Sequence, residues 1–265
     1  MRRLIRQIGL YFGIDIQLSR VTSIIELKSL IQKMYPVKVD KKLIRVGSKK
    51  DGGYLIPDDF DGIEALFSPG VGNKQDFDLE LADKGIKVFM CDASVKGPKI
   101  NHKKFKFIKK FLGSIDNELF ISLETWVREL NLSDDSDLIL QMDIEGSEYE
   151  VIYSMPRYIL NRFRIIIIEF HNLDMLWNRQ FFDKCKNTFL KLLETHYIVH
   201  IHPNNCCKTL KKNDIEIPPV LEITFYRKDR AKVIGYANKF PHPLDVDCTN
   251  DKPLVLPKCW YENNE

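Results

Sequence analysis

The sequence predicts an α/β fold in which helices cover both faces of a mostly parallel sheet. From Ala65 onward, short apolar runs alternate with segments of helical spacing, the order expected of strands joined by crossover helices. The run Ile165-Ile166-Ile167-Ile168 is typical of a central strand that is buried on both sides. Polar and ionisable residues follow most of the predicted strands, which indicates a ligand site at one edge of this sheet.

Length and composition are those of one large globular domain and exclude several classes of protein. The chain has 265 residues, of which 44% are hydrophobic and 29% charged, and its formal net charge of +3 is too balanced to indicate a nucleic-acid partner. Arg6 and Gln7 interrupt the first apolar stretch, so we predict neither a signal sequence nor a transmembrane segment. The six cysteines show no paired Cys-x-x-Cys spacing, which favours free thiols in the reducing cytoplasm.

Residues 1–40 are expected to form an N-terminal helical extension. One apolar stripe of helical spacing is expected from Ile24, Ile25, Leu27, Leu30 and Ile31. For the basic, amphipathic start of the chain we expect a helix packed on the domain, and the alternative is a weak membrane contact. After the extension, extended runs around the Asp-Gly-Gly sequence at 51–53 predict a hairpin.

The central domain is expected to span residues 41–230, followed by an irregular tail at 231–265 that packs on it, because prolines interrupt any periodicity there. No full helix separates the last two strands, so an antiparallel strand is expected at one edge of the sheet. The lysine-rich residues 96–110 suit an exposed edge strand better than a nucleic-acid groove. Strands are predicted at 65–68, 87–91, 106–111, 138–142, 164–170, 197–202 and 220–227, and helices at 76–84, 123–130, from 147 onward and at 179–195.

The end of the first predicted strand suggests that a ligand approaches the backbone closely. Gly70 and Gly72 carry no Cβ, and they follow Ser68 at the end of that strand. Asp92 ends the next strand, where a carboxylate can accept hydrogen bonds from both hydroxyls of a ribose, and Ala93-Ser94 follow it. A glycine turn alone is also a common structural feature, but the two features together point to a nucleoside cofactor.

The helix after the glycine turn distinguishes between two such cofactors. A dinucleotide site uses a third glycine, so that the helix N-terminus can approach the pyrophosphate. Here that glycine is missing and Asp76 lies at the helix start, where it would repel a phosphate. The pattern therefore favours S-adenosylmethionine, which carries no phosphate, over NAD, and Asp76 is included among the candidate cofactor contacts.

Three side chains at the ends of the fourth and fifth strands are the candidate catalytic residues. Asp143, also a candidate cofactor contact, ends one strand, while Glu169 and His171 alternate along the other and so face the same side. We expect all three to surround an acceptor oxygen. Either they hold a divalent cation such as Mg²⁺ or Mn²⁺, or His171 acts alone as a general base with a pKa near neutrality. Ser147 and Glu148 are interpreted as helix caps.

Candidate substrate-binding residues follow the fourth and sixth strands. Two of the histidines share a face by strand alternation, and two asparagines offer amide groups to a substrate hydroxyl. The alternative for the asparagines is a plain turn closed by Pro203. The candidates are Glu145, His200, His202, Asn204 and Asn205.

Several of these segments resemble the FkbM-type S-adenosylmethionine-dependent methyltransferases. The resemblance covers about residues 43–228 and is carried by Phe67-Ser-Pro-Gly-Val-Gly72, Asp143-Ile-Glu-Gly-Ser-Glu148 and Ile168-Glu-Phe-His171. Residues 45–47, 51–54, 200–205 and 219–224 are similar to a bacterial branch of the family. The resemblance implies a Rossmann-like class I methyltransferase fold, with a seven-stranded sheet whose last strand is antiparallel.

The resemblance also implies further cofactor contacts and a function. Arg45, Asp51, Gly53 and Tyr54 are expected to contact the methionine end of the cofactor, with Arg45 pairing with its α-carboxylate. The expected reaction is O-methylation of a hydroxyl on a sugar or nucleotide-sugar, in bacterial surface-polysaccharide biosynthesis. The alternatives are N-methylation of an amide or amino sugar, an NAD-dependent oxidoreductase, and a binding module without catalysis. Whether the chain forms a homo-oligomer stays open.

Overall fold

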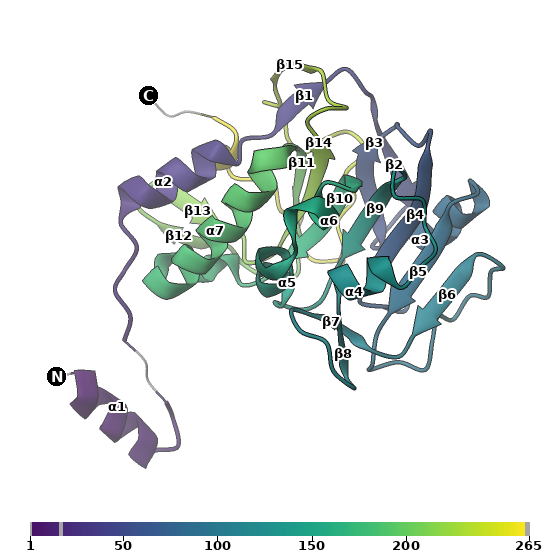
Figure 1. Ribbon diagram of the computed structural model, residues 1–265. Coiled ribbons are helices and arrows are strands. Elements are labelled where there is room, and N and C mark those ends of the chain that lie inside the picture. Colours follow the sequence, from purple (N-terminus) through teal and green to yellow (C-terminus); the bar gives the residue numbers. More distant parts are fainter. Residues whose placement is uncertain (1, 16–17, 263–265) are drawn as a thin grey trace.

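The computed structural model describes residues 2–15 and 18–262 (Figure 1). Residues 1 and 16–17 of the predicted extension, and 263–265 of the predicted tail, lie outside the described residues. The helices are α1 (Arg2–Tyr11), α2 (Ile24–Lys33), α3 (Asp76–Asp83), α4 (Leu123–Arg128), α5 (Glu148–Ser154), α6 (Arg157–Leu160) and α7 (Arg179–Thr195), with the 3-10 helices η1 (Leu173–Trp177) and η2 (Lys258–Trp260). Among these described helices, none has the length and apolar character needed to cross a bilayer.

The strands fall into one large sheet and several two-stranded sheets. The large sheet is built from β4 (Ile63–Pro69), β5 (Lys87–Cys91), β6 (Phe105–Ile108), β9 (Asp137–Met142), β10 (Phe163–Phe170), β11 (His196–Pro203) and β14 (Leu221–Arg227). The others are β1 (Val37–Val39), β2 (Leu43–Gly47), β3 (Gly53–Pro57), β7 (Phe111–Gly113), β8 (Phe120–Ser122), β12 (Leu210–Lys212), β13 (Ile215–Ile217) and β15 (Val233–Tyr236).

The order of strands in the large sheet is β11-β14-β10-β9-β4-β5-β6. The strands from β10 to β6 are parallel, whereas β14 runs antiparallel to both β10 and β11. This is the Rossmann-like class I methyltransferase fold, so the predicted fold class is confirmed. The lysine-rich strand β6 lies at one edge, as expected. The antiparallel strand, however, lies between β10 and β11, and the prediction that it is added at an edge is wrong.

β14 occupies an inner position because both of its sides are buried. Ile223 and Phe225 pack into the apolar core on one side of the sheet, and Tyr226 packs into the core on the other. Thr224, on the same side as Tyr226, donates a hydrogen bond to the carbonyl oxygen of Leu55 at 2.7 Å. β14 is thus covered on both sides of the sheet and pairs with β10 and β11 along its two edges.

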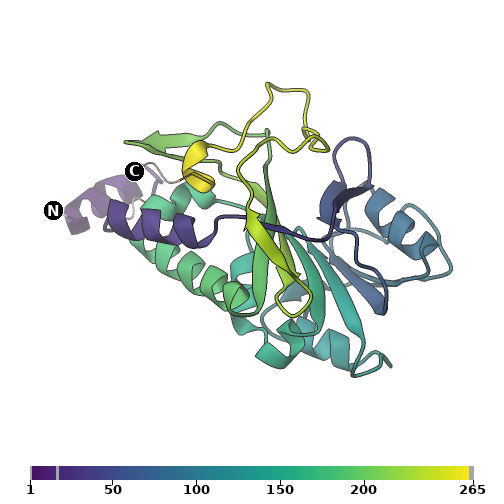
Figure 2. The same ribbon diagram turned by 90° about the horizontal axis from the view of Figure 1, so that it is seen from above.

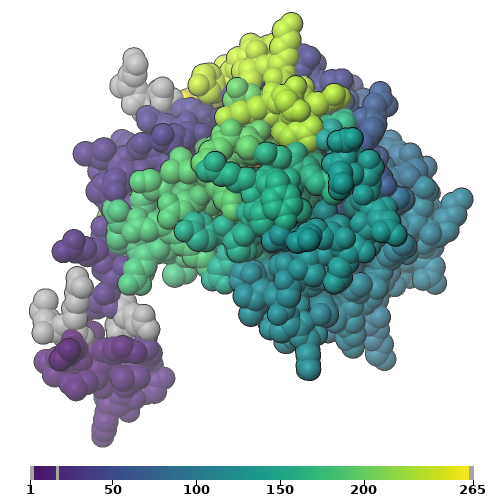
Figure 3. Space-filling view, viewed as in Figure 1, coloured from purple at the N-terminus to yellow at the C-terminus, as the bar shows by residue number. Residues whose placement is uncertain are grey.

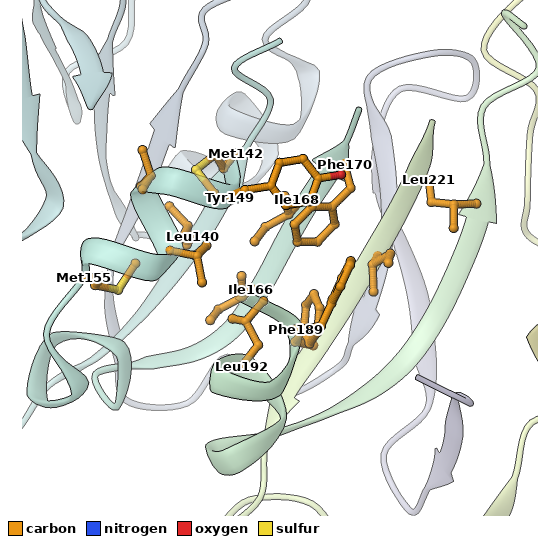
Figure 4. Close-up of a cluster of buried hydrophobic side chains, with 14 of the residues drawn as sticks. Leu140, Met142, Tyr149, Met155, Ile166, Ile168, Phe170, Phe189, Leu192 and Leu221 are labelled. Carbon is orange, nitrogen blue, oxygen red and sulfur yellow. The ribbon is translucent and has the colours of Figure 1, made fainter. Parts of the chain in front are cut away.

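The sheet separates two apolar layers (Figure 2). Ile166 and Ile168 of β10 face the layer that contains α5 and α7, where Phe189 lies close to them (Figure 4). Ile165 and Ile167 face the opposite layer, which α3 and the hairpin of β2 and β3 cover. All four isoleucines are at most 1% exposed, which confirms the prediction of a strand buried on both sides.

The two end segments of the chain pair with each other. β1 and β15 form a two-stranded antiparallel sheet, and Trp260 of η2 is fully buried. The tail that the sequence predicts to be irregular therefore contains a strand and a helical turn, because the backbone of β1 gains hydrogen-bond partners there. The division of the chain into an extension at 1–40, a central domain at 41–230 and a tail at 231–265 stays a prediction.

The two helices of the N-terminal extension behave differently. Leu27, Leu30 and Ile31 of α2 are buried in the core, as their spacing predicts. The inclusion of Ile25 in that stripe is wrong: it is 78% exposed on the solvent side of the helix. Within the described residues, α1 contributes no side chain to either apolar layer, and it stands away from the body of the protein (Figures 1 and 3). The expectation that this helix packs on the domain is wrong, because α2 and α7 already cover the neighbouring face of the sheet.

Candidate cofactor and catalytic site

A sharp turn after β4 brings two strand ends into contact. Gly70 has a φ of +85°, and a Cβ there would lie 1.7 Å from the carbonyl oxygen of Asp143 at the end of β9. A side chain is therefore excluded at this position. A Cβ on Gly72 would meet no atom of the chain outside its immediate neighbours within 4 Å, as far as the described residues go. The turn thus joins two strands at Gly70 and leaves open space beside Gly72.

Asp92, at the end of β5, holds this turn in place. One oxygen of its carboxylate accepts a hydrogen bond from the backbone N–H of Val71 at 2.9 Å. The other accepts from the backbone N–H and the hydroxyl of Ser94, at 2.7 and 2.6 Å. Asp92 is buried and Ala93 half-buried beside it. The structure therefore places the glycine turn, Asp92 and Ser94 together, with the Asp92 carboxylate engaged by the protein itself.

A cavity of about 270 Å³ lies against the glycine turn, between β4, β9, α3 and the loop of the β2–β3 hairpin. It brings together six residues that the sequence singles out as cofactor contacts. These are Asp51, Tyr54, Ser68, Gly70, Gly72 and Asp143. The further lining residues are Gly52, Val71, Asn73, Lys74, Phe77, Asp78, Met90 and Gln141.

The other six predicted contacts are not among the residues that line this cavity: Arg45, Gly53, Asp76, Asp92, Ala93 and Ser94. The guanidinium of Arg45 donates to the carbonyl oxygens of Ser48 and Lys50, at 2.8 and 2.6 Å, and so shapes the hairpin loop. A Cβ on Gly53 would lie 2.1 Å from the Ser48 carbonyl oxygen, so this glycine permits the tight loop. Asp76 is exposed at the start of α3. Arg45 and Gly53 therefore position the wall of the cavity.

Asp78 lines the cavity where the sequence suggested Asp76. The apolar residues Phe77 and Leu81 mark the buried side of α3, and Asp78 lies on that side with 6% exposure. Burial raises the pKa of its carboxyl to about 6. One of its carboxylate oxygens has no hydrogen-bond partner among the described residues. An acidic residue within an apolar helical stripe was the available signal, and the analysis of strand ends missed it.

Gln141 of β9 connects two walls of the cavity, and it too was missed. Its amide oxygen accepts from the hydroxyl of Ser68 at 2.9 Å, and its amide nitrogen donates to the hydroxyl of Tyr54 at 3.2 Å. Burial, followed by the negative charges of Glu222 and Glu169, raises the pKa of Tyr54 well above its usual value. The phenol is therefore neutral, and Gln141 holds the hairpin against the sheet.

His171 lies next to the cavity wall, among carboxylates from the loop after β9. Its Nδ1 is 3.0 Å from Oε1 of Glu148, while its Nε2 is 3.5 Å from Glu145 and 3.8 Å from Asp143. Glu148 is fully buried and also accepts hydrogen bonds from the backbone N–H groups of Ile144 and Gly146. It therefore fixes the His171 ring and the loop together.

The expected roles of Ser147 and Glu148 as helix caps are only partly met. Ser147 occupies the position before α5, but its side chain makes no capping hydrogen bond. Glu148 binds backbone N–H groups of the preceding loop instead of those inside the helix. The loop turns through the left-handed region at Glu145 (φ 56°) and Gly146 (φ 103°), which exposes these N–H groups to Glu148.

The charges around His171 change its protonation. Burial alone would lower the pKa of His171, but the hydrogen bond with Glu148 and the charges of Glu148, Glu169 and Asp143 outweigh it and raise the pKa to about 9. Burial, followed by the charge of Glu169, raises the pKa of Asp143 to about 8. The expectation of a His171 pKa near neutrality is therefore wrong, and the ring is an imidazolium at pH 7 in the ligand-free protein.

The candidate metal ligands differ by one residue from the predicted set. Ligand atoms of Asp143, Glu145 and His171 all lie within 4.8 Å of one another. Glu169 points elsewhere, since its carboxylate accepts a hydrogen bond from the side chain of Asn204 at 2.9 Å. Glu169 also lies opposite Glu222 in the register of β10 and β14. The left-handed turn at Glu145 brings that side chain back toward His171, and strand alternation alone does not reveal this.

Most of the predicted substrate-binding residues at the end of β11 hold the C-terminal tail. His200 lies 2.8 Å from Asp245 through Nε2. Asn205 donates to the carbonyl oxygen of Thr249 and accepts from its N–H. His202 is 6% exposed, and neither of its ring nitrogens has a hydrogen-bond partner among the described residues. The prediction of a shared histidine face is right, but the tail covers that face, so these residues are not open to a substrate.

The cysteines agree with the expectation of free thiols. All six, which lie within the described residues, are free. Cys206 and Cys207 are exposed neighbours, while Cys248 donates a hydrogen bond to Glu222 at 3.3 Å.

Comparisons with known proteins add the following. A scan against protein-family models gives no match, and a search of curated proteins gives none either. Among solved structures, the chain is similar to a Thermoplasma acidophilum protein assigned as a methyltransferase (8% identity, 67% of this chain and 79% of that chain, TM-score 0.33). It is also similar to EvdMO1, with 14% identity over 77% of this chain and 48% of that chain and a TM-score of 0.27. A third similar structure is an antibiotic-related methyltransferase, with 12% identity over 77% of this chain and 93% of that chain and a TM-score of 0.28. Likeness at these TM-scores carries no argument about function, and the similarity to FkbM-type enzymes stays a resemblance.

Proposed function

We propose that this protein is an S-adenosylmethionine-dependent methyltransferase. The observation that carries the proposal is the charge of the cavity beside the glycine turn. Asp51, Asp78 and Asp143 line it, and Lys74 is the cation among its described lining residues, paired with Asp51 at 2.8 Å. Lys74 balances Asp51, and the raised pKa of Asp143 keeps that carboxyl largely protonated, so the remaining negative charge of the lining is that of Asp78. A buried carboxylate suits a sulfonium or an ammonium group, and it disfavours the pyrophosphate of a dinucleotide.

The side chains present fit this cofactor. The open space beside Gly72 would hold the nucleoside, and Asp51, Tyr54 and Asp143 would face the methionine end. The unpartnered oxygen of Asp78 is a free acceptor for a donor group of the ligand. The cofactor supplies an electrophilic methyl group, and the protein contributes orientation in a site that excludes water.

His171 is proposed as the general base for the acceptor. Its ring is oriented by Glu148, and it must lose its extra proton before it can accept one from a hydroxyl. A positive charge in the adjacent cavity favours this loss, because it opposes the carboxylates that raise the pKa of the ring.

A second proposal keeps the divalent cation: Asp143, Glu145 and His171 offer ligands that suit Mg²⁺ or Mn²⁺. Exhaustive chelation should abolish turnover only in that case.

The finer proposal concerns the acceptor. By resemblance to FkbM-type enzymes, we propose a hydroxyl of a sugar or nucleotide-sugar made for a bacterial surface polysaccharide, in the cytoplasm. Free thiols support a reducing compartment. N-methylation of an amide or amino sugar is the alternative, because the half-buried carboxyl of Glu169, whose charge acts on Asp143, also suits an amine.

Isothermal titration calorimetry with S-adenosylhomocysteine tests the cofactor. We expect binding by the wild-type protein and a loss of about tenfold or more in Asp78→Asn, since a charge-assisted hydrogen bond contributes about 1.5–3 kcal/mol. Asp76→Asn is the matched control: it changes the same residue type on the exposed side of α3 and should bind normally. Binding of reduced nicotinamide dinucleotide without binding of S-adenosylhomocysteine would overturn the proposal.

A mass-spectrometric screen of sugar and amino-sugar acceptors then tests catalysis. A methyl mass increment that depends on S-adenosylmethionine identifies both the acceptor and the O- or N-target. Cofactor binding without product from any acceptor would favour the binding module instead.

A further inference from the structure

α1 has two chemically different sides. Leu4, Ile8 and Tyr11 are spaced by four and three residues and form one apolar stripe, which Ile5 and Phe12 widen. The polar side carries Arg3 and Arg6, and the sequence of the helix contains no acidic residue. Such a helix normally buries its apolar stripe, because exposing several large apolar side chains to water is unfavourable.

The apolar stripe of α1 is uncovered in the monomer. Leu4 is 60% exposed, Ile8 52%, Tyr11 85% and Phe12 70%. In the described part of the chain, neither apolar layer includes a residue of α1, and the space-filling view shows the helix as a separate lobe (Figure 3). The segment after the helix folds back on its polar side, where Arg6 pairs with Asp15 at 2.7 Å. Among the described residues, no comparable segment covers the apolar side of α1.

We propose that α1 docks the protein on the surface of an anionic lipid bilayer. The helix has 10 residues and is therefore about 15 Å long, too short to span a bilayer but suited to lying in its interface. Its apolar stripe would enter the acyl boundary, while Arg3 and Arg6 would remain at the level of the headgroups. Tyr11 carries an apolar ring with a polar hydroxyl, the combination that favours the interface.

Charge complementarity selects an anionic surface over a second copy of the chain. The helix itself carries arginines and no carboxylates, which disfavours pairing with a second copy. Because Arg6 is paired with Asp15 in the segment that follows, the gain from negatively charged headgroups comes mainly from the exposed Arg3. The proposal is independent of the proposed enzymatic function, because it concerns a lobe that is remote from the cavity. From the sequence alone, a membrane contact of this helix was the less favoured alternative. The exposed apolar stripe makes it the favoured one.

Co-sedimentation of the full chain with vesicles tests the proposal. We expect binding to vesicles of phosphatidylcholine with about 30% phosphatidylglycerol, and little binding to phosphatidylcholine alone. Ile8→Asp, in the middle of the apolar stripe, should weaken binding at least tenfold. Arg3→Gln should weaken it about fivefold, which corresponds to about 1 kcal/mol per basic residue.

The matched control is Ile25→Asp on α2. Ile25 is 78% exposed but lies outside α1, so this variant should bind vesicles like the wild type. Unchanged thermal unfolding shows that each variant is folded. Equal binding to both kinds of vesicle, or wild-type binding by Ile8→Asp, would overturn the proposal. So would a dimer in light scattering that Ile8→Asp dissociates, when no vesicle binding is seen, because the stripe would then pair with a second copy.

Discussion

The proton on His171 depends on Glu148, and replacing that carboxylate tests the interpretation of the site. Glu148→Gln keeps the size of the side chain and an oxygen that can accept from the N–H groups of Ile144 and Gly146. It removes the negative charge 3.0 Å from His171 Nδ1. Of the contributions that raise the pKa of His171, the hydrogen bond and charge of Glu148 are the largest.

The size of the expected effect of Glu148→Gln follows from how far the pKa of His171 is raised. A rise in the pKa of His171 from 6.5 to about 9 corresponds to about 3 kcal/mol in favour of the imidazolium. A hydrogen bond to a charged group contributes about 1.5–3 kcal/mol of such a preference. We therefore expect Glu148→Gln to lower the proton affinity of His171 by about tenfold or more, and its pKa to fall toward 6.5.

The raised pKa of His171 also determines whether the stability of the protein rises or falls with pH. The folded state binds the His171 proton more tightly than the unfolded state, so this stabilisation is fully present below pH 6.5 and lost as the pH rises through about 9. The raised pKa of Asp143 acts in the same direction, because the unfolded chain releases that proton at lower pH than the folded protein. Wild-type stability should therefore decrease from about pH 6.5 to 9, and Glu148→Gln should flatten this decrease.

Two measurements check this prediction. Histidine side-chain NMR follows the titration of His171 directly, with His171→Gln to assign its signal, and thermal unfolding across the same pH range follows the stability. If the wild-type ring titrates at or below 6.5, or if Glu148→Gln leaves its midpoint unchanged, the proposed role of the carboxylates is refuted.

Three further predictions concern packing around the site. Gly70→Ala should abolish S-adenosylhomocysteine binding in calorimetry and cost about 1–3 kcal/mol, because its Cβ has no room and its φ is +85°; normal affinity would contradict the tight turn. Arg164→Met removes the buried cation between Asp137 and Asp59, at 2.7 and 3.4 Å, and should lower the free energy of unfolding by about 3–5 kcal/mol in urea titration, whereas a loss below 1 kcal/mol would argue against the network. Asn205→Ala should release the tail and speed proteolysis beyond residue 240 several-fold; protection equal to the wild type would show that other contacts hold it.

The fold was largely predictable because it depends on patterns that are local in the sequence. Alternation of apolar strands and helices, and the four isoleucines of β10, determine which strands are central. The inner position of β14 was not predictable from chain order, because it depends on the burial of both of its sides. The place of α1 was missed for a related reason: amphipathic spacing predicts a covered stripe but does not identify what covers it.

The site was predictable where it follows strand ends and not where it depends on loops. Gly70 and Asp143 meet because parallel strands end at the same edge. Glu145 joins His171 through a left-handed turn that its residue type does not favour. His200 faces the tail through Asp245, a residue from a segment without periodicity. Contacts between distant irregular segments leave no regular pattern in the sequence.

The guanidinium of Arg45 has a third contact, with the carbonyl oxygen of Leu244 at 3.4 Å. Through it, the hairpin loop that forms one wall of the cavity is joined to the C-terminal segment that β11 anchors. A ligand that orders the hairpin loop should therefore also reduce the motion of a segment almost two hundred residues away in sequence. Cleavage of that segment should in turn make the loop at the entrance of the cavity more mobile. The segment around Leu244 thus supports the hairpin loop from outside, although Leu244 is not among the described residues that line the cavity.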